Sequence, residues 1–225
     1  MKAISSWLFL ILLSISIPAW SIAYSAKEIE GWVVDAETKQ PLEGVNVVAR
    51  WHLNFGLDRR VDASLMLMEA VTDQSGRYYF PAWGPEPIPT ELPEDARMRN
   101  IYPAIIFFRS GYAWRSEFNR SVGPDEDFEL TLRTSDWNGK TVELTKFQGN
   151  LEQYASFTDG VLRGVRYGNC RWKKIPRMII ALTKEKERLK QKNTFSAVPT
   201  IRDIELSSVG QDCGSVQEFF KGYLK

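Results

Sequence analysis

The sequence predicts a mainly β protein, a small sandwich followed by a smaller helical extension. Apolar and polar residues alternate along residues 28–35 and 42–51, where β-branched and aromatic side chains dominate, and a period of two is typical of strands. Residues 73–76 (DQSG) have the composition of a tight turn between two further apolar segments. From Ile175 onward, apolar residues recur at three-, four- and seven-residue spacings, which indicates an amphipathic helix.

Length and composition set the class of protein. The chain has 225 residues, of which 44% are hydrophobic and 25% are charged. Such a chain can bury a core and is neither disordered nor fibrous. The formal net charge is +1, which argues against nucleic-acid binding through bulk charge. One His and two Cys leave little room for metal or thiol chemistry, so we expect no metal and no cofactor.

Residues 1–25 have the pattern of a secretory signal peptide. Lys2 gives the N-terminal region its positive charge, residues 7–17 form the apolar region, and Pro18 ends it. The triplets 19–21 (AWS) and 23–25 (AYS) each suit a cleavage site, and the second is preferred, which places the start of the mature chain near residue 26.

The competing interpretation of the same segment is an uncleaved anchor. A membrane span needs about 20 apolar residues, and this run is shorter. No Cys follows it that could carry a lipid in the bacterial lipoprotein manner. We therefore expect a periplasmic or secreted protein, with no stable transmembrane segment after cleavage.

Charge is distributed unevenly along the chain. Residues 27–162 hold 14 basic and 22 acidic residues, whereas residues 163–192 hold 11 basic and 2 acidic residues. Two interpretations of this basic segment remain open. In the first, the segment docks on the acidic body or its basic residues form a solvated helix face. In the second, it presents a surface to an anionic partner such as a lipid headgroup or an envelope polymer.

The strands of the predicted sandwich follow one another along the body. The expected strands lie at 28–35, 42–51, 65–72, 77–80, 102–109 and 127–132. Polar insertions interrupt this series at residues 52–64 and at residues 81–100, the second of which contains five prolines. Long loops at one end of a sandwich can bind ligands or can be decoration.

Several of these residues form a recognisable pattern. Its parts are Ile29-x-Gly31-x-Val33-x-Asp35, Pro41-Leu42-x-Gly44-Val45-x-Val47, Thr72-Asp73-x-x-Gly76-x-Tyr78-x-Phe80 and Ser110-Gly111-Tyr112. Over roughly residues 28–133 the chain resembles the carboxypeptidase regulatory-like domain. The resemblance implies a seven-stranded, Greek-key, transthyretin-like β-sandwich, which we place at residues 26–133. It implies little about function, because this domain recurs as an accessory module on unrelated proteins.

Residues 134–225 are expected to form a partly helical, disulfide-stapled extension. Residues 134–170 give no confident element. A helix is expected from Ile175 to about Asn193, and a second at 215–224, where Ser215 and Glu218 form a capping box. Both helices either pack on the body or on each other, or they contact a partner or membrane.

Cys170 and Cys213 are predicted to form a disulfide, because two cysteines in an exported protein usually pair. The bond would close a loop of about 44 residues and contribute about 4 kcal/mol in the chain-entropy model. Free thiols and an intermolecular bond are the alternatives. A metal site is not expected, since the two cysteines and the distant His52 give no tetrahedral ligand set.

No catalytic constellation is recognised in the sequence. His52 is the sole histidine and is expected to border a loop. A catalytic triad would need it beside a nucleophile, and no G-x-S-x-G occurs. The acidic run 125–127 is either a solvated loop or a pair of carboxylates for acid–base chemistry. We therefore expect no catalytic residues and a protein that is not an enzyme.

Tryptophan is the unusual component, and it suggests a site. Trp83, Trp114 and the neighbouring Tyr112 lie near expected loops, where they could stack on a sugar; the alternative is that they fill the core. The first functional hypothesis is an exported, non-enzymatic binding or structural accessory protein of the cell envelope, whose partner is an unknown envelope protein or glycan. The second is a carbohydrate- or peptidoglycan-binding module, and the third is a hydrolase with an unrecognised carboxylate site.

Overall fold

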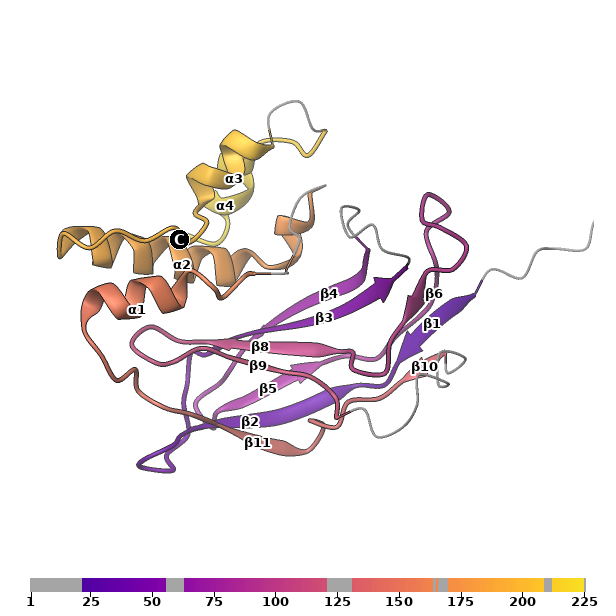
Figure 1. The fold of residues 1–225 in the computed structure, drawn as a ribbon, viewed down its shortest axis with the longest axis horizontal. Coiled ribbons are helices and arrows are strands. Elements are labelled where there is room, and N and C mark those ends of the chain that lie inside the picture. The colour runs from indigo at the N-terminus through magenta and orange to yellow at the C-terminus, as the bar shows by residue number, and fades with distance from the viewer. Residues whose placement is uncertain are drawn as a thin grey trace, which may run out of the picture.

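A computed structural model of the chain describes residues 22–55, 63–120, 131–163, 165, 170–208 and 212–224. Within these residues the protein is mainly β with helices toward the C-terminus, which confirms the predicted class at this level (Figure 1). The strands are β1 Ala23–Ala26, β2 Ile29–Asp35, β3 Asn46–Asn54, β4 Ser64–Val71, β5 Arg77–Phe80, β6 Trp83–Pro87, β7 Arg97–Met98, β8 Ala104–Phe108, β9 Arg115–Glu117, β10 Leu132–Arg133 and β11 Lys140–Leu144. The helical segments are α1 Leu151–Thr158, the 3-10 helix η2 Arg171–Lys174, α2 Pro176–Gln191, α3 Ile201–Ser207 and α4 Val216–Lys221.

The strands form three sheets. One has the order β11-β2-β5, a second β4-β3-β8-β9 with β7 also paired to β3, and a third β10-β1-β6. The described residues thus contain eleven strands in three sheets, so the expected count of seven in one Greek key is not confirmed. The difference arises partly in the Pro-rich insertion, where residues 81–100 contain β6 and β7.

Residues 134–170, for which the sequence predicted no element, contain both a strand and a helix. β11 pairs in parallel with β2, from Lys140 opposite Gly31 to Leu144 opposite Asp35, and buries Val142 and Leu144. Helix α1 begins at a capping box in which Asn150 accepts the N–H of Gln153 and the Gln153 side chain accepts the N–H of Asn150.

Two hydrophobic cores share β3. One lies between the sheets and contains Val47, Ala49 and Trp51 of β3. The other lies under the helices, where Val48 of β3 packs with apolar residues of β4, β8, η2 and α2. Because successive strand side chains point to opposite faces, β3 is buried on both sides. Figure 1 shows η2, α2, α3 and α4, which we call the helical layer, on the side of the sandwich that carries β3 and β4.

The helical layer docks on the sandwich, as the first interpretation of the basic segment held. Glu69 of β4 accepts the backbone N–H groups of Arg177 and Met178, at 3.0 and 2.6 Å, in the first turn of α2. A carboxylate at a helix N-terminus satisfies free N–H groups and complements the helix dipole. Burial raises the pKa of Glu69, against the lowering effect of these two hydrogen bonds.

The predicted N-terminal segment lies mostly outside the described residues, which start at Ile22. Ala23–Ala26 form strand β1, so the folded body includes residues before the boundary expected at 26. In the part of the chain that the structure describes, none of the helices has both the length and the apolar character to cross a membrane.

Candidate functional site

Cys170 and Cys213 form a disulfide, as predicted. Cys170 directly precedes η2 and Cys213 lies shortly before α4, so the bond joins the start of the helical layer to its end. The rings of Trp172 and Phe220 stack beside it, with centroids 5.8 Å apart and an interplanar angle of 24°. A covalent link and an apolar contact therefore hold the same two segments together.

Trp83 is not a surface aromatic. Its side chain is 9% exposed, and its ring meets Trp51 edge-on at a centroid distance of 5.4 Å. Trp83 belongs to the core between the sheets, which is the alternative that the sequence left open. A stacking ligand needs a free ring face, so Trp83 cannot serve as the predicted platform.

Tyr112 and Trp114 are also engaged in contacts within the protein. The Tyr112 hydroxyl donates to Oδ2 of Asp35 at 2.8 Å, and the Arg109 guanidinium lies 5.4 Å from its ring centroid. The Trp114 indole N–H donates to the carbonyl of Phe157 at 2.8 Å. Trp114 packs against the core under the helices, whereas Trp83 belongs to the core between the sheets, so the candidates form no common surface.

Asp35 is the most strongly perturbed carboxylate near these residues. Its Oδ1 accepts the backbone N–H groups of Glu37 and Thr38, both at 2.9 Å, while Oδ2 accepts from Tyr112. The bond from the Thr38 N–H, followed by that from Tyr112, lowers the pKa of Asp35 to about 2. Asp35 thus ends β2 in a turn and ties it to the segment after β8, which is a structural role.

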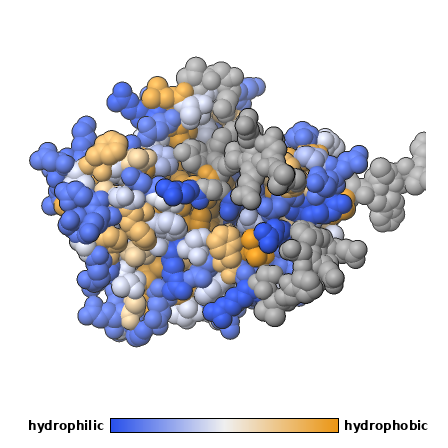
Figure 2. Space-filling view, in the orientation of Figure 1, coloured by the Kyte–Doolittle hydropathy of each residue, from blue (hydrophilic) through white to orange (hydrophobic). Residues whose placement is uncertain are grey.

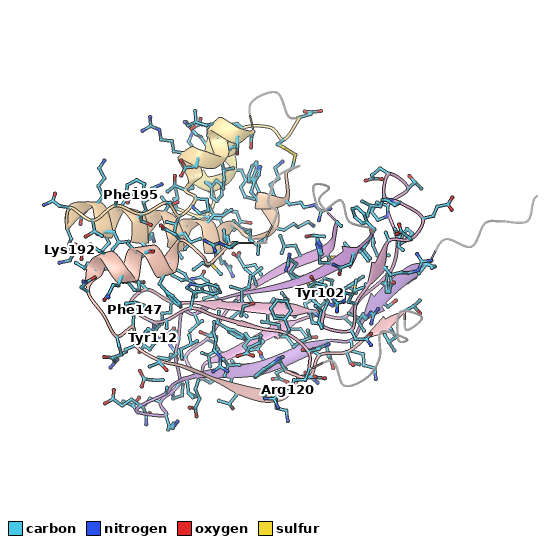
Figure 3. All side chains as sticks on the ribbon, in the orientation of Figure 1. Tyr102, Tyr112, Arg120, Phe147, Lys192 and Phe195 are labelled. Carbon is cyan, nitrogen blue, oxygen red and sulfur yellow. A yellow bond between two sulfur atoms is a disulfide. The ribbon has the colours of Figure 1, made fainter. Side chains whose placement is uncertain are left out.

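His52 lies in β3, which continues through it to Asn54, rather than in a loop. Its ring centroid is 5.7 Å from that of Tyr102, and the Arg50 guanidinium lies 5.5 Å from the same Tyr102 ring. Figure 3 shows Tyr102 and Tyr112 toward opposite ends of β8. The acidic run 125–127 falls outside the described residues, among which no cluster of three or more His, Cys, Asp or Glu could hold a metal ion.

A buried polar cluster, which the sequence did not single out, fixes the helices to the sandwich. Glu185 of α2 is 2% exposed and accepts hydrogen bonds from the Ser110 hydroxyl at 2.5 Å and from Arg188 Nε at 3.0 Å. Burial raises the pKa of Glu185, but the bonds from Arg188 and Ser110 outweigh it, so the pKa lies below its usual value. Nearby, the Tyr154 hydroxyl of α1 accepts the Gly111 N–H at 2.9 Å.

A groove with a volume of about 890 Å³ runs between α2, α3 and α4. Its apolar lining comes from Ile180, Ile201, Leu206 and Leu224, of which Leu206 is 65% and Leu224 56% exposed. Figure 2 shows hydrophobic residues breaking the mainly hydrophilic surface over α3 and α4. We call this feature the helical groove.

Charged side chains border the helical groove. The lining includes Lys184, Lys186, Glu187, Lys190, Arg202, Asp203 and Glu205. Lys186 pairs with Asp203 at 3.3 Å, and the Gln217 amide donates to Glu205 at 2.8 Å. Among the described residues, Lys184, Lys190 and Arg202 have no ion-pair partner. The groove thus combines an apolar floor with cations that are free to meet a ligand.

Comparison with known proteins identifies no family. No protein-family model matches the chain, and no curated protein sequence matches it either. Among solved structures, the chain is similar to 3-chlorocatechol 1,2-dioxygenase from Rhodococcus opacus 1CP, with a TM-score of 0.31, 16% identity, and coverage of 56% of this chain and 61% of that chain. Wild-type catechol 1,2-dioxygenase from Acinetobacter radioresistens gives a TM-score of 0.31, 18% identity, and coverage of 56% and 53%.

The dioxygenase domain of a dioxygenase carbohydrate-binding protein fusion from Streptomyces sp. SirexAA-E gives a TM-score of 0.30 and 14% identity. It covers 59% of this chain and 86% of that domain, whereas the chain spans only 53–61% of the two other enzymes. All three neighbours are enzymes, which contradicts the prediction of a non-enzymatic binding or structural accessory protein. At these TM-scores and identities, the likeness carries no reaction over to this chain.

Proposed function

We propose that the protein is exported to the periplasm or the medium and binds a single-chain anionic lipid in the helical groove. Export is supported by the positive start and apolar run within residues 1–21. The Cys170–Cys213 disulfide adds support, since such bonds persist mainly in oxidising compartments. A groove of this kind occurs in enzymes and in binding proteins alike.

The fold that carries the groove is proposed to be a carboxypeptidase regulatory-like sandwich. The sheets β11-β2-β5 and β4-β3-β8-β9 together supply seven strands, with β1, β6, β7 and β10 as additions. Two residues of the family pattern, Asp35 and Tyr112, are hydrogen-bonded to each other. An experimental structure with this strand order would support the assignment, and a different order in either sheet would reject it.

The observation that carries the ligand proposal is the pairing of an apolar floor with unpaired cations. The volume of about 890 Å³ lies within the range of about 300–1,000 Å³ typical of small-molecule sites. Leu206 and Leu224 expose apolar surface that an acyl chain would cover. Covering this surface removes it from water, which favours binding without any directional contact.

The cations at the rim favour an acidic headgroup over a neutral one. Lys184 and Lys190 lie on α2 and Arg202 on α3, so they approach the groove from both walls. Long basic side chains place their charge in water while their stems cover apolar surface. Because these charges are exposed, their attraction for an anion is modest and falls as salt screens it.

Titration with two lipids of equal chain length tests the proposal. Purified protein is titrated with palmitoyl lysophosphatidylglycerol and with palmitoyl lysophosphatidylcholine, both below their micelle concentrations, by calorimetry. We expect the anionic lipid to bind about fivefold more tightly or better at low salt, since each exposed ion pair contributes about 0.2–1 kcal/mol. Equal affinities, or no binding of either lipid, would overturn the proposal.

Matched variants test separately what the cations and the apolar floor of the groove contribute to lipid binding. Lys184→Glu with Lys190→Glu should remove the preference for the anionic lipid, whereas Lys140→Glu with Lys146→Glu on the sandwich changes the net charge equally and should leave it intact. Leu206→Asp should weaken both lipids, since it places a charge in the apolar floor. Circular dichroism of each variant shows whether it is folded before its affinity is compared.

A further inference from the structure

Strand β1 belongs to the folded body. It lies between β6, with which it is antiparallel, and β10, with which it is parallel. Tyr24 is completely buried, and its hydroxyl accepts the backbone N–H of Met98 at 3.0 Å. The Arg133 guanidinium lies 5.2 Å from the Tyr24 ring centroid. Residues 23–26 therefore form a strand of the sheet, and Tyr24 and Ala26 belong to the core.

The surrounding chain is shaped to fit this strand. The carbonyl of Ile22 accepts the N–H of Ile88 at 3.0 Å, and the N–H of Ser25 donates to the Thr131 carbonyl at 2.8 Å. Gly84 approaches β1 so closely that a Cβ there would lie 2.6 Å from the Cα of Ser25. With φ at +103°, Gly84 also has a backbone conformation that suits glycine.

Cleavage after Ser25, the site preferred from the sequence, would cut through this strand. The mature chain would lack Ile22 to Ser25, and with them the buried Tyr24 ring and the pairing of Ala23 and Tyr24 with β6. Emptying a buried aromatic site destabilises a protein strongly. The edges of β6 and β10 that now pair with β1 would also lose their partner.

We infer that a signal peptidase instead cuts the Ser21–Ile22 bond, so that the mature protein begins at Ile22. This inference rests on the export proposed above. Ala19 and Ser21 supply the small residues that such a site needs at its third and first positions before the cut. Water adds across the peptide bond, leaving a carboxylate on Ser21 and an amino group on Ile22, and β1 stays whole.

The test is the N-terminus of the full chain expressed with a C-terminal tag in a Gram-negative host. Intact mass and N-terminal sequencing of periplasmic protein should give Ile22. A chain that begins at Ala26 or Lys27 would overturn the inference while leaving export intact. A chain that still begins at Met1 and stays in the membrane or cytoplasm would overturn both the export and the cleavage site.

Two single substitutions make the assignment specific. Ser21→Leu places a bulky residue directly before the proposed cut and should cause the uncleaved precursor to accumulate. Ala23→Leu makes the same kind of change at the third position before the rejected cut, and processing should continue at Ile22. Accumulation of precursor in Ala23→Leu, with normal processing in Ser21→Leu, would point to the site after Ser25.

Discussion

The disulfide gives the most quantitative prediction. Cys170 and Cys213 are 43 residues apart in sequence, and the chain-entropy model converts a loop of about that length into about 4 kcal/mol at 25 °C. For a chain of this size, 1 kcal/mol corresponds to roughly 2–4 °C in melting temperature. Replacing both cysteines with alanine should therefore lower the melting temperature by roughly 8–16 °C.

Alanine is chosen because Cys213 is buried, and serine would leave an unpaired hydroxyl there. Urea unfolding followed by far-UV circular dichroism measures the free energy of unfolding of the oxidised protein, the reduced protein and the Cys170→Ala, Cys213→Ala variant. The last two should agree. If the free energy of unfolding of the double variant lay within about 1 kcal/mol of that of the oxidised protein, the predicted contribution of the disulfide would be wrong. Contacts such as that of Trp172 with Phe220 would then hold the helical layer alone.

Three further predictions concern single residues. Tyr24→Ala should lower the free energy of unfolding by about 3–5 kcal/mol. Tyr24→Phe keeps the ring and should lower it by only about 1–2 kcal/mol. If urea unfolding gave equal losses for the two variants, the ring would not be packed in the core. Because the pKa of Glu185 is lower in the folded protein, its ionised carboxylate contributes fully to stability above about pH 4.5, its ordinary pKa. This contribution is lost as the pH falls through the pKa of the folded state. Plots of unfolding free energy against pH for wild type and Glu185→Gln should therefore converge in acid, and a constant gap would contradict this. Trp83→Phe should cost roughly 1–3 kcal/mol of stability without changing lipid affinity in calorimetry, and a loss of affinity would place the ring in the site.

Much of the fold follows from short-range patterns. Residues 29–35 alternate between buried and partly buried positions along β2, so the period of two in the sequence is the pleat itself. The helix predicted from Ile175 is α2, which starts at Pro176 and ends at Gln191, close to its expected bounds. The second helix is α4, which spans Val216–Lys221 within the expected 215–224. The Ser215 hydroxyl accepts the N–H of Glu218, but the predicted capping box is only half formed, and the Glu218 carboxylate pairs with Lys221 instead.

Other elements have only weak or competing signals in the sequence. Residues 140–144 (KTVEL) alternate with the period of a strand, and Asn150 with Gln153 has the spacing of a capping box, so both β11 and α1 carried a local signal. β1 was hidden because its residues fit a cleavage motif as well as a strand. β6 contains Pro85 and Pro87, and proline is normally read as ending a strand.

The candidate site could not be predicted from the sequence in the same way. Trp83 and Trp114 look alike in the chain, and only the packing of distant residues such as Trp51 and Phe157 decides that they are used internally. The helical groove joins residues of α2 with residues of α3 and α4, and no local pattern records that these helices meet. The basic segment 163–192 contributes Lys184, Lys186 and Lys190 to the lining of this groove, so the charge distribution in the sequence pointed to one part of the surface.

A crystal structure of the protein with palmitoyl lysophosphatidylglycerol would show whether the lipid binds in the helical groove. We expect the acyl chain to lie against Leu206 and Leu224, and the phosphate to lie within hydrogen-bond distance of Lys184, Lys190 or Arg202. A lipid bound elsewhere, or an empty groove at saturating lipid, would contradict this expectation.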